Sequence, residues 1–534
     1  MKLRIRDAAA VVAAMLVAFV ARGARFDAGR LLYETDARAK ALRVEDNVAA
    51  LERGDAPAFA VGNIVRWLEL KGVDCGEWRR RYAVKDVPVG PPLASREGGS
   101  LGYMLDISRD KVPTMEMLKN VVSLLASLGY NEFQLYTEHA FAYAGHEAAW
   151  RGASPMTPEE VRDLDAFCAA RGVRLMPNQS SFGHMEKWLR RAEYRDLAET
   201  PGGYTVDWIP GLKDRPPCAL CPTDERTYAF LDGLYAQLLP NFRHASCVNV
   251  GCDEVWDIFD ASGRSAAKVR EKGVARVYMD HLKRIHALLR ARGFRMAFWA
   301  DMVLYAPELL DEVPKDSVAL LWNYGNERDF PGITAENEGR MQALRMRGLD
   351  VVVCPSTRVY GTWFGRTGPM MGNVSLMDGI ARRYGAKGLL LTTWGDGGHR
   401  APFVAEVPAI VYAAMLARGE SPDEAGLAAE IDRALGCRVG AALLEIGRID
   451  ARDADAPRRV RRAAASADLA GAQGWVARGF RTFLLAADFI EGDRCGDCGE
   501  RYRRLWLADS REGGLAESMD EIGIGKPGRK GDGR

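Results

Sequence analysis

Residues 247–254 read Cys-Val-Asn-Val-Gly-Cys-Asp-Glu, an apolar run that ends at a glycine and is followed by two acids. Short apolar runs of this kind recur along the chain and alternate with longer amphipathic segments. Most are hydrophobic throughout, as expected for strands buried on both faces of a parallel sheet. We count eight: Tyr103–Ile107, Glu132–Tyr136, Arg174–Pro177, Cys247–Gly251, Arg295–Trp299, Ser317–Trp322, Asp350–Cys354 and Lys387–Thr393.

The segments between these runs have the features of helices, and one of them is expected as a single helix over 266–292. Thr157-Pro158-Glu159-Glu160, for example, combines an N-cap residue, a proline at the first helical position and acids in the first turn. Eight alternating strands and helices predict an α/β fold, a (β/α)8 TIM barrel spanning residues 98–418, for which about 250 residues is typical. A doubly wound sheet is the alternative, but the glycine fingerprint of that fold is absent after Tyr103–Ile107.

The flanks of the barrel read as helical additions. We expect a mostly helical region at residues 1–90, a helical C-terminal region at 419–515 and a disordered tail at 516–534. The apolar run Ala8–Val20 is too short to span a bilayer as a helix. Residues 1–23 resemble a signal peptide, but Asp7 and the charges after the run favour a helix packed on the protein.

The overall composition excludes several classes of protein. The chain has 534 residues, with 73 Lys and Arg against 72 Asp and Glu, so there is no basic excess to bind a nucleic acid. No other segment approaches transmembrane length, and we expect no stable membrane insertion. Ten cysteines are too few for a disulfide scaffold, and those in apolar stretches favour a reducing compartment, hence the cytoplasm over export. The oligomeric state stays unknown.

In a barrel, functional side chains gather where the strands end at their carboxyl termini. The predicted strands are followed there by acids and aromatic residues, and aromatic faces beside acids are the usual surroundings of a sugar ring. The residues in question are Asp106, Glu138, His139, His184, Asp253, Glu254, Trp299, Asp301, Trp322, Tyr324, Tyr360, Trp394 and Asp396.

The adjacent acids Asp253 and Glu254 are the most informative pair. One of them could cap the next helix while the other faces water, but their position between an apolar run and Trp256 favours a functional pair. Two carboxylates that flank a glycosidic bond as nucleophile and acid lie about 5–5.5 Å apart across the substrate, which neighbours on one strand cannot easily achieve. They suit a mechanism in which Glu254 protonates the leaving oxygen and Asp253 orients a substrate group that attacks.

Several motifs resemble those of glycoside hydrolase family 20, the β-N-acetylhexosaminidases, and they occur in barrel order over about residues 100–415. Gly251-Cys252-Asp253-Glu254 resembles the family's Gly-x-Asp-Glu at strand four. The other matches are Leu105-Asp106-Ile107-Ser108-Arg109 at strand one, Phe182-Gly183-His184 for Pro-Gly-His at strand three, and Trp394-Gly395-Asp396 at strand eight.

The resemblance implies a retaining exo-β-N-acetylhexosaminidase that acts on N-acetylhexosamine-containing glycans through an oxazoline formed by the substrate's own acetamido group. It implies no cofactor and no metal. Glu254 would be the general acid and base, and Asp253 would hold the acetamido N–H. Tyr324 would bond the acetamido oxygen, with Tyr360 as a rival. A near-neutral chain also suits an uncharged sugar, which needs no electrostatic steering.

The remaining residues of the resemblance would bind the sugar. Trp299, Trp322 and Trp394 would form walls, Asp396 would bind hydroxyls at O4 and O6, and His184 would support the site. Asp301 could equally cap a helix or bind substrate. The chain departs from the family at Leu101, where the family has an arginine that grips sugar hydroxyls. Glu138 or His139 would then take over that contact, and Arg109 is interpreted as structural.

Two other functions fit the same residues. A metal-dependent barrel enzyme could use His184, Asp253, Glu254 and Asp301 as ligands. A non-catalytic carbohydrate-binding barrel would bind sugar at the same rim without turnover, although such a barrel has no need of an acid beside an amide-orienting carboxylate.

Overall fold

The computed structural model describes residues 44–53, 65, 68, 73–81, 99–109, 111–206, 211–492 and 496–524. The signal-like segment 1–23 and the proposed linker before the barrel lie outside these residues. In the described part, no helix is both long and apolar enough to cross a membrane.

The strands form one parallel eight-stranded sheet with the order β3-β2-β1-β8-β7-β6-β5-β4. The outermost strands β3 and β4 meet through a parallel bridge between Asn178 and Asn249, so the sheet closes on itself. The predicted (β/α)8 barrel is therefore confirmed. The strands are β1 (Ser100–Asp106), β2 (Glu132–Tyr136), β3 (Arg174–Met176), β4 (Cys247–Asn249), β5 (Arg295–Trp299), β6 (Val318–Trp322), β7 (Asp350–Cys354) and β8 (Gly388–Thr393).

Strand pairing aligns the residues of the candidate site. Asp106 at the end of β1 pairs with Tyr136 at the end of β2, and Leu105 pairs with Thr393 at the end of β8. The strands are apolar on both faces because the helices cover them outside and side chains fill them inside, and Tyr103, Phe133 and Phe298 are fully buried. The residues that follow each strand therefore meet on one rim.

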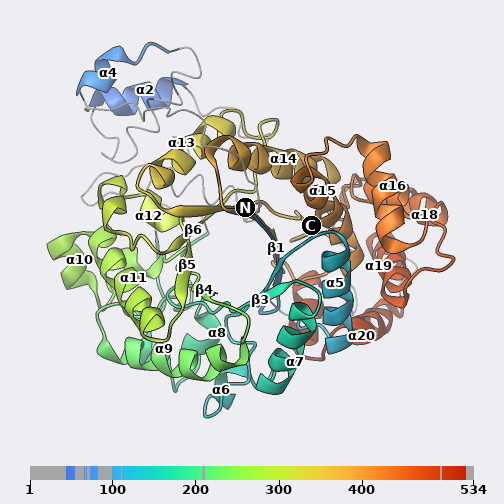
Figure 1. Ribbon diagram of the computed structural model, residues 1–534, viewed down its shortest axis with the longest axis horizontal. Coiled ribbons are helices and arrows are strands. Elements are labelled where there is room, and N and C mark those ends of the chain that lie inside the picture. Colours follow the sequence, from blue (N-terminus) through green and yellow to red (C-terminus); the bar gives the residue numbers. More distant parts are fainter. Residues whose placement is uncertain are drawn as a thin grey trace.

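Helices surround the barrel (Figure 1). Thr157 caps its helix with a reciprocal capping box to Glu160, as the sequence pattern predicts. The single helix expected over 266–292 is divided at Gly273, whose φ of 85° is left-handed. The barrel helices are α5 (Met115–Ser127), α6 (Glu147–Trp150), α7 (Pro158–Ala169), α8 (Glu186–Leu189), α9 (Glu225–Leu238), α10 (Ala266–Lys272), α11 (Val274–Ala291), α12 (Asp301–Leu304), α13 (Ile333–Arg345), α14 (Thr367–Tyr384) and α15 (Val407–Ala417).

Short 3-10 turns complete the connections, and the region between β5 and β6 contains one of them in place of a long helix. They are η2 (Arg195–Leu197), η3 (Leu239–Asn241), η4 (Asp257–Phe259), η5 (Pro307–Glu312) and η6 (Phe403–Glu406).

Helices flank the barrel at both ends of the chain. At the N-terminal end, α2 (Val44–Arg53) and α4 (Gly76–Arg81) are helical. The C-terminal helices pack on the side of the barrel that carries α5 and α15 (Figure 1). They are α16 (Glu424–Leu435), α17 (Gly440–Ile446), α18 (Ala456–Ala465), α19 (Gly474–Glu491), α20 (Cys498–Asp509) and α21 (Leu515–Ile522).

The predicted disordered tail at 516–534 begins too early, because α21 covers its first residues. This helix is anchored by Leu515, which is buried, and by Ser518, whose hydroxyl contacts the carbonyl oxygen of Gly398. Residues 525–534 lie outside the described part, and the division of the chain into domains stays a prediction.

Candidate active site

The turn after β4 places the two adjacent acids in an unusual backbone conformation. Gly251, Cys252 and Glu254 all have positive φ angles, of 68°, 69° and 49°. Backbone strain of this kind persists only where the surroundings enforce it, and it concentrates at functional sites. Here the loop after β3 presses on the turn, since a Cβ on Gly183 would lie 2.6 Å from the carbonyl oxygen of Asp253. Glycine at 183 therefore permits the β3 and β4 loops to approach.

His184 joins the two acids. Its Nε2 lies 3.3 Å from Asp253 Oδ2 and 3.6 Å from Glu254 Oε2. Burial opposes protonation of this imidazole, but the Asp253 carboxylate outweighs it and raises the pKa of His184 to about 9. The sequence grouped these three residues at one rim, and the structure brings them into direct contact.

Glu254 is set up to hold a proton near neutrality. Burial raises its pKa to about 7; His184 and Arg109 oppose this shift, and the negative charge of Asp253 adds to it. A carboxyl with a pKa near the working pH can both donate a proton and take one back. Its partner Asp253 is 7% exposed, and Oδ1 of Asp253 is buried without a hydrogen-bond partner in the part of the chain that the structure describes.

Arg109, which the sequence indicates as a structural residue, lies at the centre of the rim. Its guanidinium contacts Asp106 at 3.1 Å, Asp396 at 3.4 Å and Glu138 at 3.7 Å, and Nη2 lies 3.3 Å from His184 Nδ1. Burial lowers the pKa of Arg109, but Asp396 and the other acids outweigh it and raise the pKa above its usual range. Its place three residues after the strand-one acid Asp106 is the signal that could have identified it.

Asp106 and Leu101 occupy different ends of β1. Asp106 accepts hydrogen bonds from the backbone N–H groups of Ser108, Arg109 and Gly395, and so ties the loops after β1 and β8 together. Leu101 is the second residue of the strand and is buried. Arg109 thus places a cation at the rim from the loop after β1, whereas Leu101 lies near the opposite end of that strand.

Aromatic side chains stand beside the acids. Trp394 lies 6.0 Å from Trp299 between ring centroids, and Trp322 lies 5.1 Å from Tyr324. The indole N–H of Trp394 donates to the Tyr324 hydroxyl at 2.6 Å, and Tyr360, 6.2 Å from Tyr324, accepts a hydrogen bond from Arg358. The five rings thus form a continuous group at the ends of β5 to β8.

The guanidinium of Arg109 also packs on this aromatic group. Its central carbon lies 5.0 Å from the ring centroid of Trp394 and 5.1 Å from that of Tyr136. Cation–π contact holds the arginine against the wall while its polar edge faces the acids.

Two residues of the predicted site occupy positions that the sequence did not specify. Asp301, at the start of α12, accepts the backbone N–H of Glu254 at 3.2 Å, so it supports the strained turn. Burial, followed by the charge of Asp253, raises the pKa of Asp301 well above its usual value. His139 is buried, and burial, with Lys187 and Arg191 nearby, lowers its pKa to about 3, which keeps the ring neutral.

Among the described residues, no group of three or more His, Cys, Asp or Glu side chains is arranged to hold a metal ion. The rim itself presents a buried carboxyl with a pKa of about 7, a neighbouring carboxylate and a row of aromatic rings.

The chain is therefore a (β/α)8 barrel protein whose fourth strand ends in an adjacent acid pair beside a row of aromatic rings. The model of glycosyl hydrolase family 20, catalytic domain, matches residues 101–370, and the chain belongs to this family.

Curated relatives share part of the sequence. The chain is 25% identical over 226 residues to Hexosaminidase D of Bos taurus, covering 41% of this chain and 62% of that protein. It is 24% identical over 299 residues to a Beta-hexosaminidase of Vibrio furnissii, covering 48% of this chain and 43% of the relative. The chain thus matches less than two thirds of the length of either protein.

Solved structures of the family are also similar. The X-ray structure of the Flavobacterium johnsoniae chitobiase matches with a TM-score of 0.49 and 15% identity, covering 80% of this chain and 68% of that one.

Proposed function

We propose that this chain is a retaining exo-β-N-acetylhexosaminidase that hydrolyses terminal β-linked GlcNAc or GalNAc by substrate-assisted catalysis. The observation that carries the proposal is the pairing of two acids with different tasks. Glu254 has a pKa of about 7, and beside it Asp253 has a buried oxygen without a partner in the described part of the chain. Family membership and the names of the relatives agree with it.

In the proposed reaction, Glu254 gives its proton to the glycosidic oxygen as the bond to the anomeric carbon breaks. The acetamido carbonyl oxygen of the same sugar attacks that carbon from the opposite face and forms an oxazoline. Asp253 accepts the acetamido N–H, which orients the group and stabilises the positive charge that develops on it. Glu254 then removes a proton from water as the water opens the oxazoline, so the product keeps the β configuration.

The surrounding residues have supporting tasks in this proposal. Tyr324 receives the indole N–H of Trp394 on its oxygen, and its own hydroxyl proton is donated to the acetamido oxygen. Trp299, Trp322 and Trp394 pack against the acetamido group and the ring. Tyr360 borders this wall. His184 keeps the two acids aligned, and Asp301 holds the backbone of Glu254.

Sugar hydroxyls would meet the group of Arg109, Glu138 and Asp396. Arg109 touches both acids, so the three present donors and acceptors together, and the Asp396 side chain is 55% exposed and open to a ligand. We propose that Arg109 supplies the cationic contact that the family's strand-one arginine makes elsewhere. His139 is neutral and buried and has a positioning role beside Glu138.

The test is an assay of the whole chain with paired aryl glycosides. We expect turnover of the 4-nitrophenyl β-glycosides of GlcNAc or GalNAc, no measurable turnover of the matching β-glucoside, which lacks the acetamido group, and a β-configured first product by NMR. Equal turnover of the glucoside would exclude substrate assistance. Loss of activity with a chelator would favour the metal-dependent enzyme, and sugar binding without any turnover would favour the carbohydrate-binding barrel.

The pH profile follows from the protonation of Glu254. Because the reactive form carries the proton and the pKa is about 7, we expect kcat/KM to be lost as pH rises above about 7, by about tenfold per pH unit. Rates measured from pH 5 to 9 at constant ionic strength check this. A profile that falls near the ordinary glutamate pKa, or that stays level to pH 9, would contradict the assignment of Glu254.

A further inference from the structure

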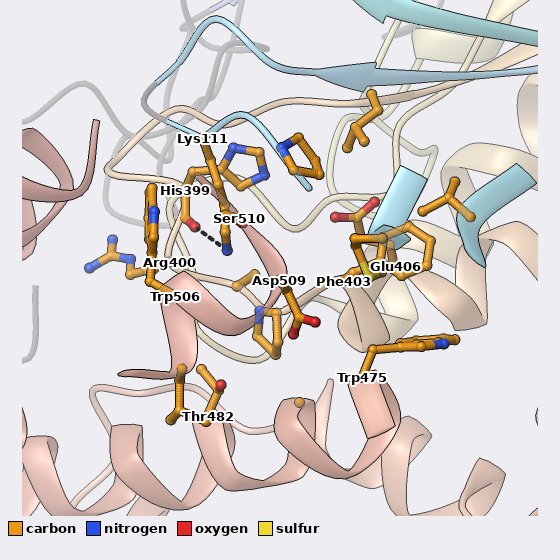
Figure 2. Close-up of a pocket in the computed structure, with 18 of the residues that line it drawn as sticks. Lys111, His399, Arg400, Phe403, Glu406, Trp475, Thr482, Trp506, Asp509 and Ser510 are labelled. Atoms are coloured by element: carbon orange, nitrogen blue, oxygen red, sulfur yellow. Dashed lines mark hydrogen bonds between the residues drawn. The ribbon is translucent and has the colours of Figure 1, made fainter. Parts of the chain in front are cut away.

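A cavity lies between the barrel and the C-terminal helices, and its lining residues differ from those of the candidate active site. Its walls come from the loops after β1 and β8 and from α5, α19 and α20 (Figure 2). The cavity volume is about 60 Å³, several times the roughly 10–15 Å³ that one water molecule requires. It can therefore accept a molecule of a few heavy atoms.

Lys111 provides the cation of this cavity. Its amino group donates to the carbonyl oxygen of His399 at 3.4 Å and lies 4.8 Å from the ring centroid of Trp506. Among the described residues, no carboxylate oxygen lies within 4.0 Å of the Lys111 amino group, the distance that would make an ion pair. Lys111 is half-buried, and an ammonium group that is partly withdrawn from water without a counter-ion is costly. Burial accordingly lowers the pKa of Lys111 to about 8, although Asp509 and Glu406 oppose the shift.

The acids of the cavity are already engaged elsewhere. Asp509 accepts hydrogen bonds from Arg478, at 3.0 Å from Nε and 2.5 Å from Nη2. Glu406 accepts hydrogen bonds from the hydroxyls of Tyr103 and Thr393, and burial raises its pKa to about 7, so it carries only part of a charge at neutrality. Neither acid is committed to Lys111.

Two further titratable groups of the lining, His399 and Arg400, do not supply a negative charge. Burial lowers the pKa of His399 to about 3, which leaves the ring neutral. Arg400 is a second cation and donates to the carbonyl oxygen of Gly361. Among the described groups that line the cavity, the positive charge of Lys111 and Arg400 therefore exceeds the negative charge that Asp509 and Glu406 leave available to a ligand.

Most of the remaining lining is apolar, although the hydroxyl-bearing residues Thr482, Tyr502 and Ser510 also belong to it. Phe403 and Trp475 lie together on one side, across the cavity from Lys111 (Figure 2). Met117, Val121 and Leu505 also line the cavity. A ligand that fits both parts carries a negative charge at one end and a short hydrocarbon group at the other.

We propose that this cavity binds a small monocarboxylate, with its carboxylate at the Lys111 amino group and its hydrocarbon part against Phe403 and Trp475. The site is separate from the proposed hydrolase reaction, and its occupancy does not depend on that reaction. A short hydrocarbon chain fits the volume, and a single negative charge matches the Lys111 ammonium, which has no carboxylate partner among the described residues.

Butyrate and butyramide form a matched pair that tests the proposal, since they have nearly the same shape and differ in charge. Titration of the full chain, followed by ligand-observed NMR or calorimetry at pH 6.5, should show saturable binding of butyrate and at least tenfold weaker binding of butyramide. Acetate should bind more weakly than butyrate because it lacks the hydrocarbon that meets the apolar wall. Binding should weaken as pH rises above about 8, where Lys111 loses its proton.

Lys111→Met should weaken butyrate binding at least tenfold, whereas Lys387→Met, at an exposed lysine, should leave it unchanged. Equal binding of butyramide, wild-type affinity in Lys111→Met, or displacement of butyrate by equimolar chloride would each overturn the proposal. If Lys111→Met does not fold, the butyrate–butyramide comparison and the pH series on the wild-type chain decide the question without it.

Discussion

Replacing Glu254 by glutamine is expected to lower kcat for 4-nitrophenyl β-N-acetylhexosaminides by about 10²- to 10⁴-fold, the range that general acid–base catalysis contributes. The amide has nearly the same shape as the carboxyl but cannot give a proton to the leaving oxygen or take one from water. Because its N–H and C=O still fill the space beside His184, KM should change little. Steady-state kinetics of the wild-type chain and the variant measure both effects.

Two controls separate the loss of the acid from general damage. Glu308→Gln makes the same chemical change at an exposed glutamate of η5 and should leave kcat unchanged. A 2,4-dinitrophenyl glycoside, whose leaving group needs less protonation, should show a smaller loss at the bond-breaking step in Glu254→Gln. The variant should also lose the decline of kcat/KM above pH 7. Turnover of Glu254→Gln at the wild-type rate would exclude Glu254 as the acid.

Asp253→Asn should reduce kcat by about 10²- to 10³-fold, similar to the loss of one group positioned for the transition state. The carboxylate oxygen that would accept the acetamido N–H becomes part of an amide, which bears no negative charge to stabilise the developing oxazoline. The rate of hydrolysis and the affinity for a thiazoline inhibitor, which resembles the oxazoline, should fall together. Kinetics and inhibition constants on the same preparation provide the comparison.

The electrostatic consequences of the same change give a second readout. The Asp253 carboxylate raises the pKa of His184, so NMR titration should find a lower His184 pKa in Asp253→Asn. It also contributes to the raised pKa of Glu254, so the loss of activity with rising pH should begin at lower pH. Asp280→Asn, at an exposed position on α11, is the matched control and should alter neither value. Unchanged thiazoline affinity in Asp253→Asn would refute the proposed contact.

The barrel could be predicted because its signal is local. Each strand is buried on both faces, so each appears as a short apolar run, and the rim residues follow directly after the runs. Asp253 and Glu254 were identified in this way at β4, and His184 at β3. Gly273 shows the limit of the method, since one amphipathic pattern over 266–292 covers two helices separated by a left-handed glycine.

The sequence could not determine contacts between segments that are far apart in the chain. Arg109 follows Asp106 by three residues in the sequence. Its contacts with Glu138, His184 and Asp396 exist only because closure of the barrel brings the loops after β1, β2, β3 and β8 together. The support that Asp301 gives to the backbone of Glu254 likewise joins the ends of β5 and β4.

The barrel and the place of the acid pair after its fourth strand could be predicted from chain order, because hydrophobic runs and the residues that end them follow one another along the chain. Only the tertiary structure shows which ionisable groups lie close enough to change one another's pKa or to form ion pairs. Burial and neighbouring charges give Glu254 a pKa of about 7, and packing of α19 and α20 against the barrel encloses Lys111 without a carboxylate partner among the described residues. The pKa of Glu254 and the surroundings of Lys111 both depend on contacts between residues that are far apart in the chain.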